Sequence, residues 1–143
     1  MAAQKWDSIV RFHLHARALI GAVLLMASAL AAAHSLAAPN DYRFELVRAQ
    51  PAGPGKTTVT VRLVHAPDSK PVDGAVLFES KTDMGPGGMA EMTGKVSSLP
   101  SDQPGFYRFQ IETGMAGKWA LNLGAKVQGE TGTVRGTVVY EAK

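Results

Sequence analysis

Apolar and polar residues alternate along most of the chain after residue 38, which is the pattern of β-strands that bury one face. In the clearest run, Val59, Val61 and Leu63 share one face, and threonine and arginine occupy the other. The alternation predicts about seven strands, at 42–47, 58–63, 75–80, 96–99, 106–111, 119–123 and 133–140. The fourth is the weakest, because only Val96 and Leu99 mark it.

Segments rich in glycine and proline separate these runs, as turns between strands do. They lie at 51–55, 67–68, 73–74, 85–88, 103–105, 114–117 and 129–132. No stretch after residue 38 shows sustained helical spacing. We therefore predict an all-β, immunoglobulin-like β-sandwich of about seven antiparallel strands, with a small closed barrel as the alternative. The expected core aromatic residues are Phe44, Phe109, Trp119 and Tyr140.

The first 37 residues have a different character from the rest of the chain. Lys5, Arg11 and Arg17 precede an uncharged, mostly apolar stretch at 18–33, and small residues follow it. This order predicts a secretory signal peptide at 1–37, cleaved after Ala37 or alternatively after Ala33, and a domain at 38–143. The apolar stretch is shorter than the roughly 20 residues that span a bilayer. We expect a periplasmic protein without a membrane span after cleavage; an uncleaved N-terminal anchor is the alternative.

Composition excludes several classes of function. From residue 38 onward, 12 Lys and Arg face 11 Asp and Glu, so no strongly basic face for nucleic acid is expected. The chain has no cysteine, which excludes disulfides, thiolate zinc sites and a cysteine nucleophile. Of the four histidines, only His65 lies beyond the predicted leader. No catalytic triad and no carboxylate pair for acid–base chemistry stand out, so we do not expect an enzyme.

Methionine placement is the feature that points to chemistry. Four of the six methionines follow the predicted leader, and three of these fall within nine residues around a Gly-Pro-Gly-Gly turn. They are Met84, Met89, Met92 and Met115. Thioether sulfur is a neutral, soft ligand that suits Cu(I), and by the same softness Ag(I). The alternative is that these residues form an apolar patch for a protein partner, as methionine does at adaptable binding surfaces.

A shared site requires the chain to bring these residues together. Met89 and Met92 would point to opposite faces of a regular strand, so they converge only if the segment bends or bulges. Met115 lies in a predicted hairpin tip, and loops cluster at the two ends of a sandwich. His65 is a further candidate ligand, or else a hydrogen-bonded residue at a strand end. We interpret Asp83, beside the turn, as a solvated loop charge.

Several segments resemble the YtkA-like domain family, which is related to FixH. The resemblance rests on residues 71–76 (PVDGAV), the Met/Gly segment 83–94, residues 104–107 (PGFY) and residues 114–121 (GMAGKWAL). It implies an extracytoplasmic, immunoglobulin-like domain linked to heavy-metal handling, especially copper efflux or copper delivery to oxidases. By position, Met84, Met89 and Met92 match the family's Met-rich loop, and Met115 matches the Met before Gly-x-Trp.

The sequence departs from the family in its Gly-Pro-Gly-Gly turn, which replaces a denser run of Met and His, and in its cleavable leader. The leader favours a soluble carrier over a membrane-bound oxidase assembly factor. The expected function is a periplasmic Cu(I) or Ag(I) carrier or efflux accessory whose partners are copper efflux or delivery machinery of the envelope. The alternative is a metal-free interaction module of an envelope efflux or oxidase-assembly complex.

Overall fold

The computed structural model describes residues 39–143, so the predicted signal peptide and its cleavage site lie outside the described residues. A short 3₁₀ turn, η1 (Pro39–Asp41), precedes eight strands, and a second 3₁₀ turn, η2 (Gly85–Gly87), lies between β4 and β5. The strands are β1 (Tyr42–Pro51), β2 (Lys56–His65), β3 (Lys70–Pro71), β4 (Val76–Met84), β5 (Met89–Leu99), β6 (Phe106–Glu112), β7 (Gly117–Lys126) and β8 (Val134–Ala142). Within residues 39–143, no helix is long and apolar enough to cross a membrane.

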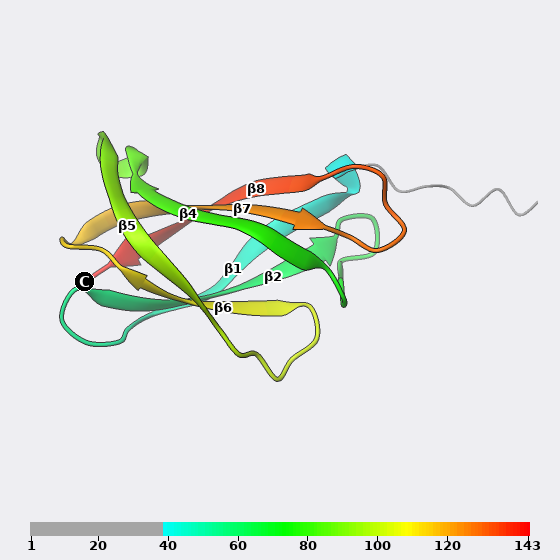
Figure 1. Cartoon of the computed structure of the whole chain (residues 1–143), viewed down its shortest axis with the longest axis horizontal. Helices are drawn as coiled ribbons and strands as arrows, with labels where there is room; N and C mark the ends of the chain where they lie inside the picture. Colours follow the sequence, from blue (N-terminus) through cyan, green and yellow to red (C-terminus); the bar gives the residue numbers. More distant parts are fainter. Residues whose placement is uncertain (1–38) are drawn as a thin grey trace, which may run out of the picture. The chain divides into compact units, whose positions relative to one another are not determined.

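The strands pair in the order β1-β2-β6-β5-β4-β7-β8, and the two-residue β3 pairs with β2. Every pairing is antiparallel. Figure 1 shows β1, β2 and β6 in one layer and β4, β7 and β8 in the other. The predicted all-β fold of about seven antiparallel strands is confirmed, and among the strands of residues 39–143 only β3 has no counterpart in the predicted set.

Strand β5 joins the two layers. Its first half pairs with β4, where Gly94 lies opposite Thr82, and its second half pairs with β6, where Lys95 lies opposite Glu112. The short strand predicted at 96–99 is therefore wrong in extent, because β5 begins at Met89. The first five residues of β5 are all exposed, so no apolar alternation marks this half of the strand.

The core lies between the layers and follows the predicted faces. Val59, Val61 and Leu63 are fully buried. The predicted core aromatic residues are confirmed as buried: Phe44, Phe109, Trp119 and Tyr140. The Tyr140 hydroxyl lies 3.0 Å from Oγ1 of Thr82, whose own hydroxyl donates to the carbonyl of Ala120. Burial raises the pKa of Tyr140, so its phenol stays neutral as part of the core.

The two outermost strands of the pairing order, β1 and β8, pack against each other. A Cβ atom added to Gly136 of β8 would lie 2.9 Å from Cδ2 of Phe44 on β1, so the glycine leaves room for the ring. The sheet consequently almost closes on itself, and the sandwich approaches the barrel that was the alternative prediction.

Because successive long strands run in opposite directions, the turns between them lie at the two ends of the fold (Figure 1). The turns β4–β5 (residues 85–88) and β6–β7 (residues 113–116) lie at one end, together with the β1–β2 turn; we call this the methionine end. His65 and the loops after β2, β5 and β7 lie at the other, which we call the histidine end.

Candidate functional site

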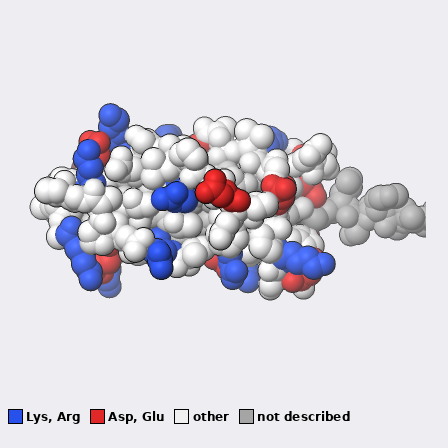
Figure 2. Space-filling model, turned by 90° about the horizontal axis from the view of Figure 1, so that it is seen from below, with Lys and Arg blue, Asp and Glu red and all other residues white. Residues whose placement is uncertain are grey.

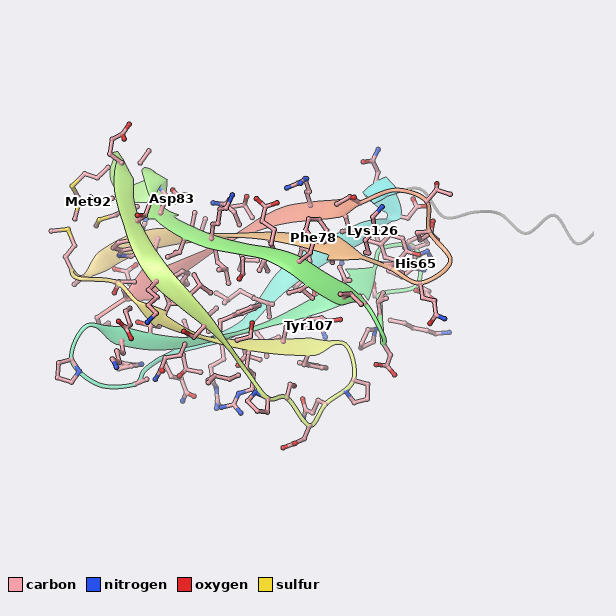
Figure 3. The ribbon with its side chains drawn as sticks, viewed as in Figure 1. His65, Phe78, Asp83, Met92, Tyr107 and Lys126 are labelled. Atoms are coloured by element: carbon pink, nitrogen blue, oxygen red, sulfur yellow. The ribbon has the colours of Figure 1, made fainter. Side chains whose placement is uncertain are left out.

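The predicted methionine ligands all come from two hairpins at the methionine end. Met84 is the last residue of β4 and lies directly opposite Met89, the first residue of β5. Met92 lies further along β5, and Met115 lies in the β6–β7 turn. Figure 3 shows the sulfur atoms of the described residues gathered at this end, around the labelled Met92. The fold therefore brings the four predicted residues to one end of the molecule.

The two hairpins contact each other through glycines. A Cβ atom on Gly117, the first residue of β7, would lie 2.6 Å from Cε of Met84. A Cβ atom on Gly87 in η2 would lie 3.3 Å from the carbonyl oxygen of Lys118. Gly117 also has φ +134°, a backbone conformation that favours glycine. The β4–β5 turn therefore packs closely against the start of β7, and the glycines at 87 and 117 leave the space for this contact.

The four methionines differ in exposure. Met84 is 5% exposed and belongs to the hydrophobic core, whereas Met89, Met92 and Met115 are 40%, 37% and 42% exposed. The backbone of the Met115 turn is held from inside, because Nε1 of the buried Trp119 donates a hydrogen bond of 3.2 Å to the Met115 carbonyl. Three methionine residues are therefore exposed at this end, and the fourth, Met84, is buried in the core.

Met89 and Met92 lie in a strand rather than in the flexible loop that the glycine-rich turn predicts. The strand is irregular at this point, because Met84 pairs with Met89 while Asp83 pairs with Thr93. Such a shift in register bulges and bends the strand. A bulge is the condition that two methionines at an odd separation need to share a side, and the irregular segment of β5 lies between Met89 and Thr93 and includes Met92.

Asp83 ties the methionine hairpin to the neighbouring strands. Its Oδ1 accepts a hydrogen bond of 2.8 Å from the amide of Gly85, and its Oδ2 accepts one of 2.7 Å from Nδ2 of Asn122 on β7. Oδ1 of Asn122 in turn accepts from Oγ1 of Thr137 on β8, at 2.7 Å. The interpretation of Asp83 as a solvated loop charge is therefore wrong. Its partner Asn122 is 39 residues away, and no local sequence signal marks that contact.

Replacing Asp83 with alanine removes the carboxylate that accepts from the Gly85 amide in the β4–β5 turn and from Asn122 on β7. We therefore expect the free energy of unfolding to fall by about 1–3 kcal/mol. The Gly85 amide should also exchange faster with solvent deuterium. Chemical denaturation and hydrogen exchange measure the two effects. Glu91→Ala is the matched control, because Glu91 is exposed on the same hairpin. Equal stability of the two variants would contradict a structural role for Asp83.

His65 is not brought to the methionines. It ends β2 at the histidine end, where its Nδ1 lies 2.9 Å from Oδ1 of Asp68 and its ring lies 5.3 Å from the ring of Tyr42. The hydrogen bond with His65 lowers the pKa of the Asp68 carboxyl. Figure 3 shows the labelled His65 and Met92 at opposite ends of the fold. Strand count could have separated them in the sequence. One full-length strand, β4, lies between His65 and Met84, and a single strand carries the chain from one end of the fold to the other.

Harder metal ligands do not gather in the described part of the chain. Among residues 39–143, no three His, Asp or Glu side chains lie close enough together to hold a metal ion. The thioethers of the methionine end are the soft donors of this region.

Comparison with known families gives one match. The model of the YtkA-like family matches residues 36–124, which is more than half of the chain. The matched region contains all four of the predicted methionine ligands and ends within β7. The resemblance noted in the sequence is thereby confirmed. Comparison with curated proteins gives no match.

Proposed function

The chain belongs to the YtkA-like family, and we propose that it is a soluble periplasmic carrier or efflux accessory for Cu(I) and Ag(I). The observation that supports this most is the exposure of three methionine residues, Met89, Met92 and Met115, at one end of the fold. Two hairpins in mutual contact carry them. The predicted signal peptide supports the location outside the cytoplasm.

The donor set fits a soft monovalent ion. Thioethers are neutral and polarisable, and they favour Cu(I) over hard divalent ions. They need not lose a proton before binding, so affinity stays nearly independent of pH where thiolate or imidazole ligands would compete with protons. The alternative soft ligand, cysteine thiolate, would be oxidised in an oxidising compartment. Methionine therefore suits a site that holds Cu(I) outside the cytoplasm.

The proposal assigns different roles to the predicted ligands. Met89, Met92 and Met115 bind the ion, because their side chains reach solvent. Met84 packs in the core, against Gly87 and Gly117, and supports the hairpin. His65 is no part of this site, since it lies at the other end and is hydrogen bonded to Asp68.

Exposure also suggests how the metal is passed on. An ion held by thioethers at the tip of the molecule can be approached by ligands of a second protein and exchanged stepwise. The partner would be copper efflux or delivery machinery of the envelope. Because no proton moves, transfer depends only on the relative affinities of the two sites.

The test is an anaerobic titration of the purified full chain with Cu(I) in the presence of a coloured Cu(I) chelator. We expect saturable one-to-one competition, shared by Ag(I) and absent for Zn(II). The triple variant Met89→Leu, Met92→Leu, Met115→Leu keeps apolar volume but removes the sulfur. In metal sites generally, mutation of a residue that only hydrogen-bonds to a metal ligand lowers metal affinity by about 10–100-fold. Loss of all three ligands should therefore weaken binding by more than about 100-fold.

Met84→Leu is the matched control, because it changes the same residue type at the buried position of the same hairpin. We expect it to bind Cu(I) with unchanged affinity. If the wild-type protein fails to compete even with a weak chelator, the carrier function is wrong. If the triple variant binds as well as the wild type, the site lies elsewhere.

A metal-free interaction module is the second candidate, and the same exposure favours it. Three methionines that are more than a third exposed form an apolar surface at the tip of the fold, as at adaptable protein-binding surfaces. The triple leucine variant separates the two functions. A partner contact made through apolar surface should survive in that variant without metal, whereas a metal carrier should lose its activity.

A further inference from the structure

The outer face of the β1-β2-β6 layer carries a pocket that shares no residue with the methionine end. Its volume is about 470 Å³. Arg48 of β1, Thr60 of β2 and Arg108 of β6 form its floor, and the β5–β6 loop forms a wall. The remaining lining residues are Val47, Ser101, Asp102, Gln103 and Phe106.

The strand register aligns the three floor residues in one row. Thr60 lies directly opposite Arg48 on one side and directly opposite Arg108 on the other. Residues directly opposite each other in antiparallel strands project from the same face. The two arginines are two strand spacings apart, about 9–10 Å at the backbone. Their long side chains can therefore reach a single group held above Thr60.

These two arginines differ from the other arginines of the described region. The other three form ion pairs with glutamates: Arg43 and Arg62 with Glu45, and Arg135 with Glu79. Within residues 39–143, neither Arg48 nor Arg108 lies within 4.0 Å of a carboxylate. The two guanidinium groups without an acidic partner thus line the same pocket.

The hydrogen bonds that the pair does make are long and go to neutral oxygens. Nη1 of Arg48 donates to Oε1 of Gln50 at 3.4 Å, and Nη1 of Arg108 donates to the carbonyl of Pro100 at 3.3 Å. A charged donor normally forms bonds of about 2.7–2.9 Å with an anionic acceptor. Most of the donor capacity of both guanidinium groups is therefore available to a ligand.

The surroundings favour a localised anion site rather than a general basic surface. Figure 2 looks from below, onto the side where β6 and the β5–β6 loop lie in Figure 1, and it shows acidic and basic groups interspersed there. Within the pocket, Asp102 offsets one of the two positive charges, and the hydroxyl of Thr60 offers a neutral donor. Val47 and Phe106 add apolar wall.

We propose that this pocket binds a small organic anion whose carboxylate or phosphate group bridges Arg48 and Arg108 above Thr60. The apolar part of the ligand would lie against Val47 and Phe106. Arginine matches either oxyanion through paired N–H donors. This site is independent of the proposed metal site, because it shares no residue with it.

The test is an NMR titration of the full chain with three probes: phenyl phosphate, phenylacetate and inorganic phosphate. We expect at least one of the phenyl compounds to give saturable shifts at the amides of Thr60, Ser101 and Arg108, and to bind more tightly than inorganic phosphate. Tighter binding of phenyl phosphate assigns the phosphate class, and tighter binding of phenylacetate assigns the carboxylate class. Both results support the proposal.

Variants identify the guanidinium groups. Hydrogen bonds to charged groups contribute strongly to binding free energy. Arg48→Gln and Arg108→Gln should therefore each weaken binding of the anion by about tenfold or more. Arg135→Gln is the matched control, because it removes the same charge from the other layer. The proposal is overturned if no probe gives saturable shifts, or if Arg135→Gln weakens binding as much as Arg108→Gln does. The second result would mean that net charge, rather than the pocket, attracts the anion.

Discussion

Replacement of Trp119 with alanine is expected to lower the free energy of unfolding by about 3–5 kcal/mol, a large share of the stability of a domain of this size. Trp119 is 1% exposed and is one of the largest fully buried side chains. It lies on β7 opposite Tyr140 of β8, and both side chains belong to the shared core. Alanine would leave a cavity that the surrounding strands cannot fill, and it would leave the Met115 carbonyl without its indole donor.

Urea or guanidinium denaturation measures this loss. Val139→Ala is the control on the adjacent strand, because Val139 is 49% exposed and its replacement should change stability by less than about 0.5 kcal/mol. Trp119→Phe removes the same hydrogen bond but leaves a smaller cavity, so its loss of stability should be smaller than that of Trp119→Ala. A loss below about 1 kcal/mol for Trp119→Ala would be too small for a fully buried tryptophan and would contradict the core described above.

The second large effect is expected at the point where β5 passes between the layers. A Cβ atom on Gly94 would lie 2.5 Å from the carbonyl oxygen of Glu112 and 2.8 Å from Cγ2 of Thr82. The carbonyl belongs to β6, which pairs with β5 at the next residue, so it cannot move away without opening that pairing. We expect Gly94→Ala to lower the free energy of unfolding by about 2–3 kcal/mol, as overpacking of a well-fitted site does.

Gly114→Ala is the matched control, in the neighbouring turn. No heavy atom lies within 4 Å of a Cβ atom built there, and the backbone is not left-handed. Its stability should be unchanged or raised by up to about 1 kcal/mol, because alanine restricts the unfolded chain. If both variants were equally stable in thermal and chemical unfolding, β5 would not cross as closely as described.

Together these two positions explain how the methionine end is held. Trp119 fixes the backbone of the Met115 turn from inside, and Gly94 lets β5 carry Met89 and Met92 across to the same end. If the proposed Cu(I) site exists, damage at either position should weaken it through loss of order in the hairpins, even though neither residue is a proposed ligand.

Local pattern was sufficient for the strands and for the core. Alternation at every second residue is a property of the segment itself, so the burial of Val61 and Trp119 could be read from the sequence. The same holds for the four aromatic residues of the core and for the YtkA-like resemblance, which depends on short motifs in order. Local pattern failed for the first half of β5, because a strand exposed on both faces has no alternation to detect.

What depends on pairing between distant strands could not be read in this way. The methionines were identifiable by type, but their different exposure follows from which hairpin packs on β7. Strand direction separated His65 from them, and Asn122, the distant partner of Asp83, came from β7. The row of Arg48, Thr60 and Arg108 exists only because β2 lies between β1 and β6 in register. Alternation of apolar and polar residues is local along the chain, whereas strand order and register are set by packing of the whole core. Each candidate site described above depends on strand order and register.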